Sequence, residues 1–96
     1  MINAPKEALG FIKRTLKEHF PDCEFRVFGS RINGKIKPYS DIDIAVVGKK
    51  KLDFTVLSDL KYAFQESELS FRVDVMDWND LSESFKKIIL EKYEVL

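Results

Sequence analysis

Several features that would narrow the function quickly are scarce in this chain. It has a single cysteine, Cys23, so no internal disulfide can form, and this usage is typical of a reducing compartment. Sixteen Lys and Arg residues balance sixteen Asp and Glu residues, so a nucleic acid is not the expected partner. No apolar run approaches the length of a membrane-spanning helix, and the first residues have no apolar signal core. We therefore expect a cytoplasmic protein that does not enter membranes.

Repeats, low-complexity tracts and linkers are also absent from the sequence, which argues against several domains. The 96 residues can build one hydrophobic core and leave no room for a second. Hydrophobic residues make up 45% of the chain and include eight phenylalanines, so a folded chain is expected rather than a disordered one. The sequence predicts a single domain over residues 1–96.

The pattern of apolar residues predicts helices and strands in the order α-β-β-α-β-α. The predicted helices run from Pro5 to Phe20, from a cap at Asp53 to Phe64, and from a cap at Asn79 or Asp80 through Ile89. The predicted strands cover residues 24–28, 41–47 and 71–78. A short additional helix can start at Ser30.

This order places three carboxylates at one edge of the predicted sheet. The second and third strands are joined through a helix, so we expect them to be parallel neighbours, whereas the shorter link between the first and second strands favours antiparallel pairing. Asp41 and Asp43 share one face at the start of the second strand, and Asp74 lies in the first half of the third. The three side chains can therefore converge near Gly29 and Ser30, which follow the first strand.

Converging carboxylates repel one another unless a cation compensates their charge. Mg²⁺ is typically held by a few carboxylates together with substrate phosphates, and a pair of such ions can stabilise both the attacking and the leaving oxygen of a displacement. Gly29 allows the backbone to approach phosphates closely, and Ser30 offers a hydroxyl and an N–H. Candidates for neutralising phosphate charge are Arg31, Lys35 and Lys37.

Simpler interpretations of the same residues stay open. An isolated Asp-x-Asp at a strand start is usually solvated charge, and Asp74 can equally face solvent. Arg72 can pair with Asp74, bind a phosphate or form a surface ion pair that contributes little. Asp77 faces away from Asp74 by strand alternation, so we expect it to serve a turn or a helix cap.

Two stretches together resemble a known family. Residues 29–34 read Gly-Ser-Arg-Ile-Asn-Gly, and residues 40–44 read Ser-Asp-Ile-Asp-Ile. With the later strand aspartate, they resemble the minimal nucleotidyltransferase (MNT) family of the DNA polymerase beta superfamily, and the resemblance spans the chain from its first helix to the closing segment. Ile32 and Asn33 depart from the small and basic residues often found there.

The resemblance implies an α/β (α+β) nucleotidyltransferase fold with a short mixed sheet flanked by helices. It implies a metal-binding catalytic set of Asp41, Asp43 and Asp74, holding two Mg²⁺ ions, with Mn²⁺ as a possible substitute. It implies nucleotide contacts from Gly29, Ser30, Arg31 and Ser40.

The implied activity is transfer of a nucleoside monophosphate, most simply AMP from ATP, to a hydroxyl on a partner protein. The family includes antitoxins that silence a helical HEPN toxin. One alternative is a catalytically silent module that binds nucleotide or masks its partner, and another is transfer to RNA or a small molecule. A homo-oligomer is compatible with the sequence, which identifies neither the base nor the acceptor.

Overall fold

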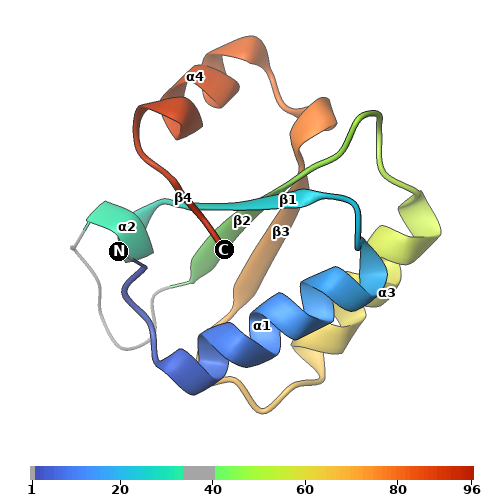
Figure 1. The fold of residues 1–96 in the computed structure, drawn as a ribbon, viewed down its shortest axis with the longest axis vertical. Helices are drawn as coiled ribbons and strands as arrows, with labels where there is room; N and C mark the ends of the chain where they lie inside the picture. Colours follow the sequence, from blue (N-terminus) through green and yellow to red (C-terminus); the bar gives the residue numbers. More distant parts are fainter. Residues whose placement is uncertain (1, 34–40) are drawn as a thin grey trace.

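Four strands form one mixed sheet in the order β3-β2-β1-β4. The computed structural model describes residues 2–33 and 41–96. Its helices are α1 (Lys6–His19), α2 (Ser30–Asn33), α3 (Phe54–Gln65) and α4 (Glu83–Glu91), with a short 3-10 helix, η1 (Trp78–Asp80). Its strands are β1 (Glu24–Phe28), β2 (Ile42–Val47), β3 (Val73–Asp77) and β4 (Glu94–Val95). Figure 1 shows α1 and α3 together on one side of the sheet and α4 on the other.

The strand pairing matches the sequence-based expectation. β1 runs antiparallel to β2, with a register from Glu24↔Val47 to Phe28↔Asp43. β2 runs parallel to β3, starting at Ile42↔Val73. A helix connects the two parallel strands, as the chain needs a crossover to return to the same end of the sheet. The predicted order of the six long elements is therefore confirmed, and the short helix at Ser30 is present.

The main core lies between the sheet and the pair α1 and α3. Each helix turns one apolar stripe toward the strands. The odd-numbered side chains of β2 do not enter this layer, because alternate side chains of a strand point to opposite faces of the sheet. Phe11 and Phe64 meet edge to face, with ring centroids 6.3 Å apart. The fully buried members of this layer include Ile12, Leu16, Val27, Ile42, Ile44, Val46 and Leu60.

A smaller apolar cluster occupies the other face of the sheet. Its buried members are Phe28, Ala45 and Ile89, and α4 covers them. The rings of Phe28 and Phe85 contact each other edge to face at 5.9 Å. Since α4 covers only part of this face, the beginning of β2 and β3 is left outside the cluster, and that is where the acidic residues lie.

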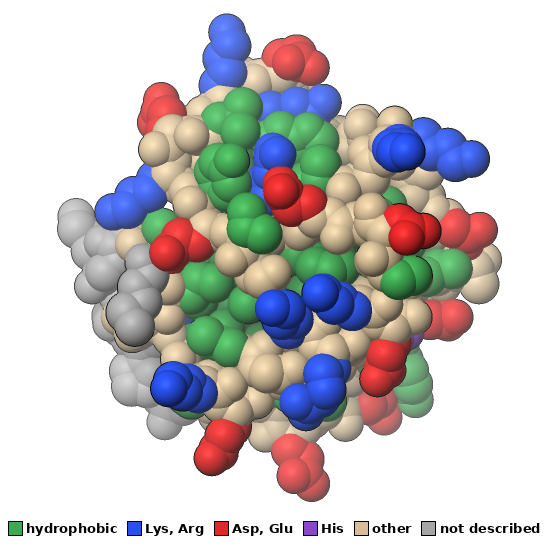
Figure 2. All heavy atoms as spheres, in the orientation of Figure 1, with side chains coloured by type: hydrophobic (Ala, Val, Ile, Leu, Met, Phe, Trp, Pro, Cys, Tyr) green, Lys and Arg blue, Asp and Glu red, His purple; other side chains and the backbone are tan. Residues whose placement is uncertain are grey.

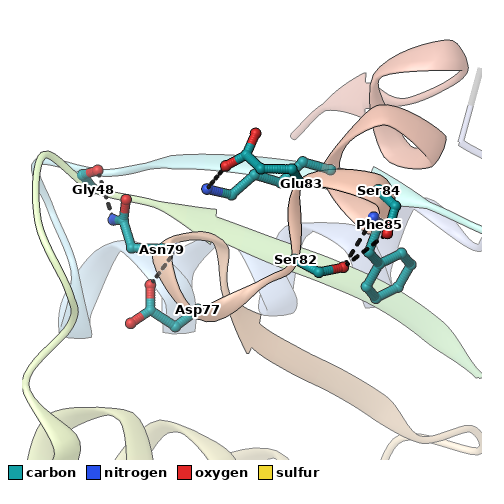
Figure 3. Close-up of polar contacts among 8 residues, drawn as sticks. Gly48, Asp77, Asn79, Ser82, Glu83, Ser84 and Phe85 are labelled. Atoms are coloured by element: carbon teal, nitrogen blue, oxygen red, sulfur yellow. Dashed lines mark hydrogen bonds and ion pairs between the residues drawn. The ribbon is translucent and has the colours of Figure 1, made fainter.

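The start of the last helix differs from the prediction. Asn79 and Asp80 lie in η1, and α4 begins only after Ser82, whose hydroxyl oxygen accepts a 3.1 Å hydrogen bond from the Phe85 N–H (Figure 3). Asn79 instead donates from its side-chain amide to the Gly48 carbonyl at 3.1 Å. The prediction was wrong because Asn, Asp and Ser are all good N-caps, and only tertiary contacts to the β2–α3 connection decide between them.

The strand β4 was not predicted. It has two residues, Glu94 and Val95, and pairs antiparallel with β1. The Leu96 N–H extends this pairing with a 2.9 Å hydrogen bond to the Phe25 carbonyl. A two-residue segment shows no alternation of apolar and polar residues. Its strand conformation follows from pairing with the free edge of β1, which only the folded structure shows.

The surface mixes charges of both signs. On the face drawn in Figure 2, Lys and Arg side chains lie among Asp and Glu side chains, with apolar patches between them. No helix within the described residues is long and apolar enough to cross a membrane.

Candidate functional site

Two of the three predicted carboxylates are direct neighbours on adjacent strands. Asp43 of β2 lies beside Asp74 of β3 in the parallel register, so both side chains project from the same face. Ile42 and Ile44, on either side of Asp43, point into the main core. Asp43 and Asp74 therefore lie on the opposite face, which α4 only partly covers. Asp41 lies immediately before β2 and shares the parity of Asp43. The pairing expected from the sequence is therefore present.

The three acids interact electrostatically. The pKa of Asp43 is raised from 3.8 to about 6, first by burial of the carboxyl group and then by the negative charges of Asp74 and Asp41. Burial and neighbouring negative charge both disfavour the ionised form. Both causes raise the free energy of the ionised Asp43 carboxylate, and a bound cation would lower it.

Gly29 passes directly over Asp43. The end of β1 is paired with this carboxylate residue through Phe28↔Asp43. Gly29 then turns the chain with a φ of +84°, a backbone conformation that L side chains rarely adopt. A Cβ added there would overlap Asp43 Oδ2. Glycine is therefore needed for two reasons: the turn requires a positive φ, and the backbone lies too close to the Asp43 carboxylate for any side chain.

Arg31 is buried and makes contacts that the sequence did not suggest. Its side chain is only 3% exposed, and its guanidinium lies 4.3 Å from the ring centre of Phe71. Nη1 donates a 3.1 Å hydrogen bond to the Asn3 carbonyl, and the Asn3 N–H donates to the Arg31 carbonyl at 3.0 Å. These contacts join the turn after Gly29 to the N-terminal segment and to the approach to β3. A nucleotide contact from Arg31 stays a prediction.

Sequence reasoning missed this structural role of Arg31. Asn3 and Phe71 are far from Arg31 along the chain and belong to no shared motif, so nothing local in the sequence pointed to them. Three further predicted residues, Lys35, Lys37 and Ser40, lie outside the described residues, and Ser30 is described only through its backbone as the start of α2.

Two charged residues near the site, Arg72 and Asp77, form an ion pair and a helix cap, respectively. Arg72 lies 3.8 Å from Asp41, and both side chains are substantially exposed, at 75% and 44%. Such a pair contributes little to stability. Asp77 is buried, and its oxygens accept hydrogen bonds from the N–H groups of Leu52 at 2.9 Å and Asn79 at 3.0 Å. The expected capping role of Asp77 is confirmed.

The donor groups near Asp43 determine how well a metal ion would fit this site. Within residues 2–33 and 41–96, no group of three or more His, Cys, Asp or Glu side chains is arranged so that it could hold a metal ion. The convergence of all three acids on one ion therefore stays a prediction. The paired Asp43 and Asp74 nevertheless offer the hard oxygen donors that Mg²⁺ prefers, and the raised pKa of Asp43 shows a charge that a cation would offset.

The chain matches one family of known proteins over most of its length. The model of the family described as polymerase beta, nucleotidyltransferase matches residues 11–96. The chain belongs to this nucleotidyltransferase family. One relative, the probable protein adenylyltransferase MntA of Haemophilus influenzae, is 42% identical over 95 residues, covering 99% of this nucleotidyltransferase and 83% of the relative.

Solved structures agree with the family. One, a toxin–antitoxin with AMP-PNP, matches with a TM-score of 0.75 and 26% identity over 90% of this nucleotidyltransferase and 69% of that chain. Another, a tri-AMPylated Shewanella oneidensis HEPN toxin in complex with MNT antitoxin, matches with a TM-score of 0.67 and 26% identity over 90% and 66% of the two chains. The predicted family and nucleotidyltransferase fold are confirmed. Nucleotidyltransferases of this family generally use divalent metal ions.

Proposed function

We propose that this nucleotidyltransferase transfers AMP from ATP to a hydroxyl on a partner protein and acts as the antitoxin of a toxin–antitoxin pair. The observation that carries the proposal is the pairing of Asp43 with Asp74 beneath the turn at Gly29. The 42% identity to a probable protein adenylyltransferase supports the reaction, and the likeness to an AMPylated HEPN toxin in complex with an MNT antitoxin supports the partner. A cytoplasmic location is part of the same proposal.

Each acid has a distinct task in this reaction. Asp41 and Asp43 would hold the metal ion that accompanies the nucleotide, and Asp74 would complete the ligands of a second ion. Bound Mg²⁺, or Mn²⁺ in its place, supplies positive charge that offsets the phosphate oxygens and lowers the pKa of an attacking hydroxyl. Around the triphosphate, the proposed protein contacts are the backbone at Gly29 and Ser30 together with Arg31 and Ser40.

The transfer is a single displacement at phosphorus. The acceptor hydroxyl oxygen forms a bond to the α-phosphorus of ATP, and the bond from that phosphorus to the bridging oxygen breaks. Pyrophosphate leaves with the electron pair of the broken bond, and the hydroxyl proton passes to the Asp74 carboxylate and then to water. Positioning and electrostatic stabilisation supply most of the rate in reactions of this kind.

The decisive experiment follows labelled AMP onto the partner. The purified chain would be incubated with Mg²⁺, ATP labelled in its α-phosphate and a purified HEPN-type helical protein as the candidate partner. Asp74→Asn should lower labelling at least about 100-fold while the circular dichroism spectrum is unchanged. Asp59→Asn, which changes an exposed acid on α3, is the matched control and should label normally. Wild-type labelling by Asp74→Asn would show that the catalytic assignment is wrong.

A partner-masking module is the second candidate, and one observation favours it. The three acids are not arranged as a ready metal site within the described residues. A masking protein would bind and inhibit its partner without ATP, and substitution of Asp41 or Asp43 would not matter. Measuring inhibition with and without ATP separates the two candidates. Transfer to RNA is less favoured, since the charges balance and are interspersed over the face in Figure 2.

A further inference from the structure

The strand that carries Asp74 forms an edge of the sheet. β3 pairs only with β2 among the described strands, because the sheet order begins at β3. The Ile42 N–H donates to the Arg72 carbonyl at 2.9 Å, so the backbone groups of residues 72, 74 and 76 face β2. The N–H and C=O groups of Val73 and Val75 consequently face outward, and no strand of the described chain pairs with them.

A groove follows this free edge. It has a volume of about 610 Å³ and lies between β3 and the C-terminal part of α3. Its lining includes Lys61, Phe64, Leu69, Phe71, Val73 and Asp74. The groove is continuous with the candidate site, because Asp74 belongs to both. An occupant of the groove would therefore lie next to the carboxylate that is proposed to receive the acceptor proton.

We propose that the acceptor segment of the partner protein binds here as an added strand, paired with the outer edge of β3. This inference rests on the proposed function and specifies how its acceptor is recognised. Residues that face each other on paired strands have Cβ atoms about 4.5–5.5 Å apart and project from the same face. The residue opposite Asp74 would therefore present its hydroxyl beside that carboxylate, and its two neighbours would point into the groove beside α3.

The charge of the groove favours an acidic acceptor segment. Two cations, Lys61 and Arg72, line it together with the single acid Asp74. A second, larger groove of about 890 Å³ between α1 and α3 has the opposite character, since four glutamates line it and no Lys or Arg does. An extended segment with an acidic residue next to its acceptor hydroxyl would suit the β3 groove, where that acid would meet Lys61, and would be repelled from the α1–α3 groove.

A proline substitution tests the backbone pairing directly. Val73→Pro removes an outward N–H at the first residue of an edge strand, where proline leaves the β2–β3 bonds intact. Val73→Thr keeps the N–H and the branched shape, and serves as the matched control. With the intact partner protein and labelled ATP, Val73→Pro should label at least about tenfold more slowly than Val73→Thr. Equal rates for the two variants would overturn strand addition while leaving the transferase reaction standing.

Amide hydrogen exchange gives a readout that does not depend on turnover. In the complex of the chain with its partner and a non-hydrolysable ATP analogue, exchange at Val73 and Val75 should slow at least about tenfold. Protection of the groove between α1 and α3 instead, or no change at Val73 and Val75, would overturn the proposal. If labelling is lost altogether in the wild-type chain, the proposed reaction fails, and the exchange measurement still decides whether a segment docks on β3.

Discussion

At the scale of the residue, Asp43 is constrained by two neighbouring segments and by burial. It is paired with Asp74 across the strands, crossed by the Gly29 turn and half-buried. Its raised pKa means that the folded, metal-free protein holds a proton more tightly than the unfolded chain does. The site therefore opposes folding when it is ionised and no cation is bound.

The sign of this effect gives a pH-dependent prediction for Asp43→Asn. The carboxyl group is protonated in both states below pH 3.8, and above about pH 6 it is ionised in both. Between these values only the folded state keeps the proton, so the contribution of Asp43 to stability falls as the pH rises. Thermal unfolding in EDTA should show Asp43→Asn about 2–5 °C more stable than wild type at pH 7, and less so near pH 4. A difference that is the same at both pH values would contradict this interpretation.

Gly29 and Gly10 offer a matched pair of glycine substitutions. At Gly29 an alanine would need a φ of +84° and would displace the Asp43 carboxylate, so we expect Gly29→Ala to cost about 1–3 kcal/mol of unfolding free energy. Gly10 lies within α1, where the nearest atom to an added Cβ is Arg14 Nη1 at 3.5 Å. Gly10→Ala should therefore stabilise by about 0.5–1 kcal/mol. Urea unfolding measures both, and a stabilising Gly29→Ala would refute the constraint.

At the scale of the element, β2 and β3 bring the site together because they are parallel and in register. Their β-branched residues fill the main core from one face of the sheet. The strand register therefore places Asp43 beside Asp74 on the other face. A register shift by one residue would turn Asp43 into the core and Ile42 out of it. The burial of one strand face thus fixes the position of the carboxylates on the other.

The N-terminus of α4 provides the prediction at this scale. Ser82→Ala removes the side-chain acceptor of the Phe85 N–H and should lower the unfolding free energy by about 1 kcal/mol (Figure 3). Asp80→Ala is the control, because Asp80 makes an exposed ion pair with Lys51 at 3.2 Å. Its loss should cost a few tenths of a kcal/mol at most. Denaturant unfolding measures both variants. A larger loss of unfolding free energy in Asp80→Ala than in Ser82→Ala would favour Asp80 as the cap.

At the scale of the whole molecule, the two faces of the sheet are packed unequally. The main core contains many fully buried side chains from α1, α3 and the strands, whereas the α4 side has three buried residues. Elements with few buried apolar contacts open at lower free energy than the rest of a domain. We therefore expect α4 to exchange its amide hydrogens faster than α1, on the same face as the candidate site.

Adjacent isoleucines of α4 test how much this smaller cluster contributes. Ile89 is 1% exposed and Ile88 is 61% exposed. Ile89→Ala should cost about 2–5 kcal/mol, because it removes a buried side chain and leaves a cavity. Ile88→Ala should change the unfolding free energy by no more than about 0.5 kcal/mol. Thermal or urea unfolding compares them, and equal losses would mean that the face buried by α4 has been assigned wrongly.

The sequence by itself determined the order of the long elements, the pairing directions and the strand positions of Asp43 and Asp74. These features follow from local periodicity and from the length of the connections, which a chain carries in its own residues. It also determined the family, through the spacing of the Gly29 turn, Asp41 and Asp43. These residues lie close together along the chain, so their spacing can be recognised in the sequence without the structure.

Only the tertiary structure decided the features that depend on distant residues. The burial of Arg31 against Phe71, the capping of α4 by Ser82 rather than Asp80, and the pairing of β4 with β1 each depend on what lies nearby in space. The raised pKa of Asp43 is of the same kind, since burial and charge from another strand create it. Desolvation and packing act between neighbours in three dimensions, and a linear pattern does not contain them.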